Sequence, residues 1–105
     1  MAEATGLYGL IGSFKAASGK RDELIALLPN GCGDMAGCRS YIVARDAADP
    51  DLIWVSEVWD SKASHEASLA LPSVRAAIVK GGSLIAGVGQ RAETIPVAGV
   101  PAAHR

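Results

Sequence analysis

Four stretches of the chain are rich in β-branched and aromatic residues and loosely alternate apolar with polar positions, as strands do. They lie at residues 7–15, 38–45, 52–59 and 84–97. In the last stretch, Gly87 and Gly89 favour a bend or a β-bulge. The polar turn residues 46–51 are too few for a helical crossover, so the second and third strands are expected to form a hairpin.

Between the strands, apolar residues recur with the spacing of a helix. The predicted helices lie at residues 20–28, 62–71 and 72–80. Ser18 is placed to cap the first helix, and Asp60 or Ser61 offers an N-cap for the second. Pro72 suits the first position of the third helix, and two glycines after Lys80 close it.

The element order strand, helix, strand, strand, two helices, strand is that of the split βαβ, ferredoxin-like fold. This is an α+β fold with a four-stranded antiparallel sheet and its helices on one face. The third predicted strand is apolar on both faces. One face carries Ile53, Val55 and Trp59, and the other carries Leu52, Trp54 and Val58. Since the helices cover only one face, we expect a second copy to cover the other, giving a homodimer with Trp54 near the seam.

Composition narrows the class of protein. The chain has 105 residues, of which 50% are hydrophobic and 20% charged, as expected for one globular domain. Its net charge of −1 argues against nucleic-acid binding through a basic face. No apolar run approaches the length of about 18 residues that spans a membrane. The N-terminus lacks the basic and apolar regions of a signal peptide, so a cytoplasmic location is expected.

The cysteines and histidines are few. Cys32, Cys38, His65 and His104 are the cysteine and histidine residues that could bind zinc. The spacing of these four residues does not match a structural zinc site. No metal is therefore expected. A disulfide between the cysteines is conceivable, but a reducing cytoplasm disfavours it. We expect both to be ordinary buried or half-buried thiols.

Three short motifs carry a family resemblance. They are S-G at residues 18–19, G-C-x-x-Y at 37–41 and E-x-W-x-S at 57–61. In this order the chain resembles the antibiotic biosynthesis monooxygenase domain family over residues 7–97, which leaves tails at 1–6 and 98–105. The resemblance implies a dimeric α+β barrel with a pocket between sheet and helices. It also implies oxidation of phenolic or quinol-type aromatics by O₂ without metal or flavin.

Family membership alone does not fix the activity, because other members degrade haem, isomerise a phosphorylated sugar signal or have no established activity. Quinol-oxidising and sugar-signal-processing members carry histidines where this chain has Ser68 and Ser73. Haem-degrading members need an axial histidine where Ile78 stands, and an asparagine near Gly12 or Ser13. The resemblance therefore implies no haem here, and no cofactor is expected.

His65 is the candidate catalytic base, because an imidazole titrates near neutral pH. On a helix it shares a stripe with Ser68, its expected hydrogen-bond partner, and Leu69. The alternative is that His65 faces solvent. Trp59 is the second candidate catalytic residue: its ring would wall the pocket, and its indole N–H could donate to substrate or oxygen. Alternatively, Trp59 is a core residue that bridges sheet and helix.

The carboxylate of Glu57 lies on the same strand face as Trp59 and requires a partner, for which Arg45, Arg75 and Arg91 are candidates. It is either half of a structural salt bridge or a catalytic acid. Other elements supply further substrate-binding candidates, although core packing also explains most of them. These are Tyr8, Ser13, Phe14, Tyr41 and Ile78.

The function predicted from the sequence is that of a cofactor-independent monooxygenase. It would oxidise a small aromatic, such as a quinol or a polyketide-like phenol, with O₂. The alternative is a non-catalytic dimer of the same fold that binds a small molecule or serves a structural role.

Overall fold

The computed structural model describes residues 6–99. Its elements follow the predicted order, with a short 3₁₀ turn, η1, before the last strand. They are β1 (Tyr8–Ala16), α1 (Arg21–Ile25), β2 (Cys38–Arg45), β3 (Leu52–Trp59), α2 (Lys62–Ser68), α3 (Pro72–Gly81), η1 (Gly82–Leu84) and β4 (Ile85–Thr94). The bounds of β2 and β3 are those predicted, whereas β4 is shorter than the predicted 84–97. Residues 100–105, with His104, lie outside the described residues.

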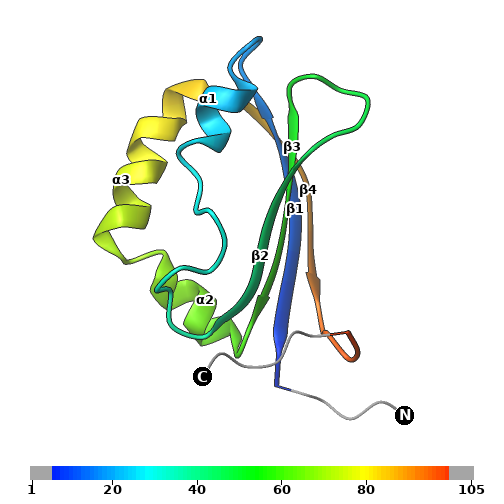
Figure 1. Ribbon diagram of the computed structural model, residues 1–105, viewed down its shortest axis with the longest axis vertical. Coiled ribbons are helices and arrows are strands. Elements are labelled where there is room, and N and C mark those ends of the chain that lie inside the picture. Colours follow the sequence, from blue (N-terminus) through cyan, green and yellow to red (C-terminus); the bar gives the residue numbers. More distant parts are fainter. Residues whose placement is uncertain (1–5, 100–105) are drawn as a thin grey trace.

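The four strands form one antiparallel sheet in the order β2-β3-β1-β4, and all three helices lie on one face of it (Figure 1). This confirms the ferredoxin-like α+β fold. The central strands β1 and β3 pair from Tyr8 opposite Trp59 to Lys15 opposite Leu52. Since facing residues point to the same side, this register sets which side chains of β1 and β3 meet beneath the helices.

The predicted irregularity in β4 is a bulge. Gly12 pairs with Arg91 but Phe14 pairs with Val88, so one residue of β1 faces two of β4. The hydroxyl of Ser13 accepts a hydrogen bond from the backbone N–H of Gln90 at 2.9 Å. It also lies against Gly89, where a Cβ would collide with the Ser13 side chain. A glycine is therefore required at position 89 for the hydroxyl to reach the bulge.

Two separate clusters form the core beneath the helices. The first joins Ala16, Leu24, Ile53 and Val55, with Leu24 supplied by α1. The second joins Tyr8, Leu10 and Trp59, and Met35 and Cys38 pack against it. Trp59 is 1% exposed and Ile53 is fully buried, so β3 anchors both clusters.

The helix caps differ from the prediction in one case. Ser61 caps α2 as expected, since its side chain accepts from the backbone N–H of Ser64 at 3.1 Å. The cap predicted at Ser18 is wrong: Lys20 occupies the N-cap of α1, and no side chain caps that end. Gly19 has a φ of 76° and turns the chain between Ser18 and the helix. Both α1 and α2 are shorter than predicted, because turns follow Ile25 and Ser68.

The other face of the sheet has no helix over it (Figure 1). Ile11 and Ile42 are 42% and 58% exposed on this face, beside the partly buried Leu52, Trp54 and Val58. The indole Nε1–H of Trp54 donates to Oδ1 of Asp46 at 2.8 Å, which fixes the ring near the β2–β3 turn. The predicted apolar second face is thus present. Within residues 6–99, no helix is long and apolar enough to cross a membrane.

Candidate functional site

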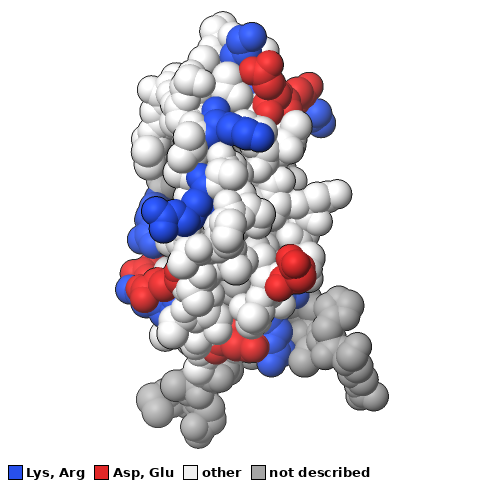
Figure 2. Space-filling view, turned by 90° about the vertical axis from the view of Figure 1, so that its left-hand side faces the viewer, with Lys and Arg blue, Asp and Glu red and all other residues white. Residues whose placement is uncertain are grey.

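A cavity of about 650 Å³ lies between the sheet and the helices. Its walls come from all four strands, the helices and the loop that follows α1. Nine of the ten predicted site residues line it, namely Ser13, Phe14, Tyr41, Glu57, Trp59, His65, Ser68, Leu69 and Ile78. Tyr8 does not line it and instead packs beside it in the cluster with Trp59. The surface on the helical side is mostly uncharged, with no broad patch of one sign (Figure 2).

The carboxylate of Glu57 is the charged centre of the cavity. Its Oε1 accepts a hydrogen bond from Nε1 of Trp59 at 3.0 Å and lies 3.8 Å from Nε2 of His65. The side chains of Glu57 and His65 are only 11% and 12% exposed. The first interaction lies within β3, and the second joins β3 to α2.

The expected arginine partner of Glu57 is absent. Among the described residues, no ion pair joins Glu57 to Arg45, Arg75 or Arg91, and Arg45 pairs with Asp22 at 2.8 Å instead. The indole of Trp59 takes the place of the arginine. It donates to the carboxylate without adding a charge, so its N–H is engaged by Glu57 and not free for substrate or oxygen.

Burial governs the electrostatics of this site. It raises the pKa of Glu57, against the opposing effects of the Trp59 hydrogen bond and of the His65 and Arg91 charges. Burial, together with the nearby Glu57 carboxylate, also raises the pKa of the Tyr41 phenol. Tyr41 faces Glu57 across the β2–β3 pair, so it stays protonated and can act as a neutral hydrogen-bond donor.

The imidazole of His65 lies between two aromatic rings and does not face solvent. Its centroid is 5.5 Å from the Tyr8 ring and 5.6 Å from the Trp59 ring, which meets it edge-on. The Tyr8 hydroxyl donates to Oε2 of Glu93 at 2.7 Å, and Lys62 lies 3.2 Å from the same oxygen. This surface network fixes Tyr8, and Tyr8 and Trp59 together confine the imidazole.

Ser68 does not contact the imidazole as predicted. Its hydroxyl donates to the backbone carbonyl of His65 at 2.6 Å, a local bond within α2 that satisfies the buried oxygen. Ser73 also lines the cavity. The hydroxyl of Ser68 is therefore engaged within α2 and makes no hydrogen bond to the His65 imidazole.

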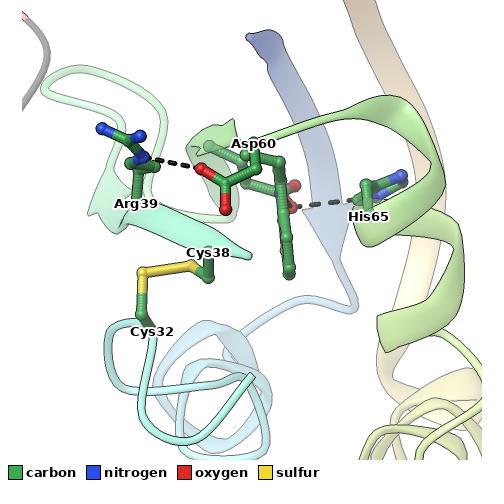
Figure 3. The surroundings of a disulfide bond; sticks show 7 residues. Cys32, Cys38, Arg39, Asp60 and His65 are labelled. Carbon is green, nitrogen blue, oxygen red and sulfur yellow. Dashed lines mark hydrogen bonds and ion pairs between the residues drawn. A yellow bond between two sulfur atoms is a disulfide. The ribbon is translucent and has the colours of Figure 1, made fainter. Parts of the chain in front are cut away.

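The two cysteines form a disulfide, so the prediction of two ordinary thiols is wrong (Figure 3). Their Cα atoms are 5.5 Å apart, within the range that a disulfide spans. Gly31, just before Cys32, and Gly33 and Gly37, between the cysteines, adopt positive φ angles that suit a tight loop. The spacing of the cysteines was compatible with a disulfide, but the expectation of a reducing cytoplasm led to the wrong prediction.

The sequence analysis did not predict some of the residues that line the cavity. The loop after α1 supplies Pro29, Asn30, Cys32 and Met35, and β4 supplies Gln90. A glycine-rich loop carries no periodic signal, so its position over the sheet was not predictable. Within residues 6–99, no group of three or more His, Cys, Asp or Glu side chains is arranged to hold a metal ion.

The chain has known relatives in sequence and in fold. The sequence model of the antibiotic biosynthesis monooxygenase family matches residues 7–80, and the chain belongs to this family. Among solved structures, a Chloroflexus aurantiacus protein described as a candidate antibiotic biosynthesis monooxygenase is 56% identical. That match covers 89% of this chain and 95% of the other, with a TM-score of 0.84.

More distant structures share the fold alone. A Deinococcus radiodurans protein, also described as a candidate member of the family, is 22% identical, with a TM-score of 0.73 over 92% of this chain and 99% of its own. A Pseudomonas aeruginosa protein is 23% identical, with a TM-score of 0.74 over 91% and 99% of the two chains. No curated protein matches the chain.

Proposed function

We propose that this protein is a cofactor-independent monooxygenase that oxidises a small aromatic, such as a quinol or a polyketide-like phenol, with O₂. The observation that carries the proposal is the buried pairing of His65 with Glu57 at the cavity, 3.8 Å apart and nearly shielded from solvent. An imidazole beside a carboxylate is a proton acceptor whose positive form is stabilised as it arises.

In the proposed reaction, the substrate supplies all the electrons. His65 removes a proton from a substrate hydroxyl, and Glu57 stabilises the imidazolium that forms. Nε2 of His65 faces Glu57 at 3.8 Å, so Nδ1 is the nitrogen left to take the proton. The electron-rich anion passes one electron to O₂, and the two radicals combine. One oxygen atom is retained in the oxidised product, and the other leaves as water.

The apolar walls would hold the substrate ring. Phe14 of β1, Leu69 at the C-cap of α2 and Ile78 of α3 line the cavity. Trp59, which is 1% exposed, closes its floor. The protonated Tyr41 hydroxyl would donate to the substrate oxygen as negative charge develops there. Ser13, Tyr8 and Ser68 are then positioning residues. Ser13 holds β4, Tyr8 confines His65, and Ser68 bonds within α2.

The proposal includes a homodimer. A second copy would cover the sheet face that carries Ile11 and Ile42, since exposed apolar patches of this kind mark interaction sites. A cytoplasmic location is also part of the proposal.

A second candidate is a non-catalytic dimer that binds a small molecule. It is favoured by Ser68 and Ser73, which stand where the resemblance places histidines in quinol-oxidising members. Ser68 donates to a backbone carbonyl and cannot replace an imidazole as a base. In this version the same cavity binds an aromatic ligand without turning it over.

Oxygen uptake distinguishes the two candidates. The full chain, treated with chelator, is supplied with a panel of hydroquinones and anthrols while dissolved O₂ and product are followed. The monooxygenase predicts uptake above the rate without protein, with one O₂ consumed per product. Calorimetric binding of the same compounds without uptake would favour the binding protein and contradict the enzyme.

A further inference from the structure

The Cys32–Cys38 disulfide is part of the cavity wall. The loop between α1 and β2 lines the cavity over residues 29–35, and Cys32 lies within that stretch. Cys38 begins β2 and packs against the buried cluster that contains Trp59. The disulfide joins the loop after α1 to the start of β2 (Figure 3). Through Cys38 it ties this part of the cavity wall to the Trp59 cluster.

Little else holds this loop in place. Its internal bonds are two turn contacts: Met35 N–H donates to the Cys32 carbonyl at 3.0 Å, and Cys38 N–H donates to the Met35 carbonyl at 3.2 Å. Beyond the loop, Asp60 N–H donates to the Gly37 carbonyl at 2.8 Å, and Met35 packs against the Trp59 cluster. Three glycines in seven residues make the open loop costly to order. The disulfide is its one covalent restraint.

The two sulfurs are placed differently. Cys32 belongs to the loop and lines the cavity, whose volume of about 650 Å³ is large enough for a small-molecule thiol. Cys38 does not line the cavity and instead packs against the buried side chains of Tyr8, Leu10 and Trp59. Both cysteines are half-buried, but Cys38 is not among the residues that line the cavity. A thiolate that enters the cavity would therefore reach Cys32 first, with the sulfur of Cys38 as the leaving group. Accessibility of this kind selects which sulfur is attacked in thiol–disulfide exchange.

We propose that Cys32–Cys38 is a thiol–disulfide exchange site that opens onto the cavity, and that its reduction releases the cavity wall. In the first step, the thiolate of a small-molecule thiol attacks the sulfur of Cys32. A mixed disulfide forms there, and Cys38 leaves as a thiolate that takes up a proton. A second thiolate attacks the small-molecule sulfur of the adduct, which frees Cys32 as a thiol and releases the oxidised small-molecule disulfide. Two electrons pass from two thiols to the protein.

The consequence is a cavity whose wall depends on the redox state. In the oxidised protein, the loop is held against the Trp59 cluster. In the reduced protein, residues 29–37 lose that restraint, and small solutes gain access to Trp59 through the cavity. This inference does not depend on the monooxygenase activity, because it concerns the loop and the sulfurs alone.

The first test locates the attacked sulfur. The oxidised full chain is incubated with glutathione, quenched with acid, and mapped by mass spectrometry. The expected adduct is on Cys32. An adduct on Cys38 would overturn the assignment. So would a disulfide that stays intact in the folded protein while the same glutathione reduces it in denaturant.

The second test measures whether the cavity wall opens when the disulfide is reduced. The chain has two tryptophans, so Trp54→Phe leaves Trp59 as the only indole that fluoresces. We expect acrylamide to quench Trp59 at least about twofold more strongly after reduction, because local opening exposes it. Amide hydrogen exchange over residues 29–37 should accelerate together with the quenching.

A double variant, Cys32→Ser with Cys38→Ser in the Trp54→Phe background, controls for effects of the reductant. It should show the stronger quenching both with and without reductant. If the double variant does not fold, the test compares the reduced and oxidised forms of the Trp54→Phe protein, which keeps both cysteines. Equal quenching and equal exchange in the oxidised and reduced proteins would overturn the proposal.

Discussion

The indole of Trp59 donates to the carboxylate of Glu57 at 3.0 Å, and the two residues lie on the same face of β3. A buried carboxylate usually receives a cationic partner, but here its hydrogen bond comes from a neutral ring. The negative charge of Glu57 is therefore left to interact with His65, 3.8 Å away. The charge of His65 lowers the pKa of Glu57, against the larger effect of burial.

Glu57→Gln should change how stability depends on pH. Burial raises the pKa of Glu57 in the folded protein above the ordinary value of 4.5, so folding favours its protonated form. Its favourable contribution is complete below that value and is lost as the pH rises through the folded pKa. The variant lacks this loss and should gain stability relative to wild type as the pH rises. Urea unfolding from about pH 4 to about pH 8 measures the difference, and parallel curves would contradict the prediction.

His65→Ala should lower turnover of a confirmed substrate by about 10²–10⁴-fold, the range for a positioned proton acceptor. More alkaline buffer should restore part of the rate, as the substrate hydroxyl ionises unaided. Steady-state kinetics against pH measure both effects. Glu66→Ala, at the next and exposed position of α2, is the control and should keep the wild-type profile. Wild-type turnover in His65→Ala would show that His65 is not the base.

Gly37→Ala should destabilise the fold more than Gly31→Ala. Both glycines have a positive φ, 80° and 85°, so each substitution costs about 1–2 kcal/mol of backbone strain. At Gly31 a Cβ meets nothing within 4 Å, whereas at Gly37 it would lie 2.6 Å from the Cβ of Ser64. Overpacking should add about 1–3 kcal/mol at Gly37. Urea unfolding compares the two, and equal losses would refute the steric explanation. Ser64→Gly should restore part of the stability of Gly37→Ala.

Ser61→Ala should cost about 1 kcal/mol of stability, because it removes the side-chain cap of α2. Ser18→Ala is the matched control. Although Ser18 precedes α1 in the sequence, it does not cap that helix, so its loss should stay within about 0.5 kcal/mol. Thermal or urea unfolding measures both. Similar losses of stability in the two variants would show that the Ser61 cap does not stabilise α2.

The strand pattern was a good guide to the fold, whereas the contacts of the site were only partly predictable. β2 and β3 were found at their predicted bounds, because alternating apolar positions and a polar turn fix them locally. The same alternation placed Glu57 and Trp59 on one face. It could not show that the indole would replace an arginine, since that depends on where Arg45 and Asp22 meet. The Cys32–Cys38 pairing likewise depends on the path of a glycine-rich loop.

Trp54→Lys should dissociate the proposed dimer. It places a charge on the uncovered sheet face, where burial against a second copy would be costly. Light scattering at micromolar concentration should give about twice the chain mass of 10.7 kDa for wild type and a smaller mass for the variant. Trp54→Phe keeps an apolar ring, loses only the hydrogen bond to Asp46, and should stay dimeric. A wild-type monomer would exclude the dimer.

The pairing of β1 with β4 links the two ends of the described chain, from Gly9 opposite Thr94 to Ala16 opposite Ile85. During synthesis, the β2–β3 hairpin is available early, and β1 can join it through β3. The outer edge of β1 then stays open until the last strand has left the ribosome. Such long-range pairing slows folding, and an open edge can pair with other chains. Premature termination before Ile85 would therefore leave an aggregation-prone sheet, not a smaller folded domain.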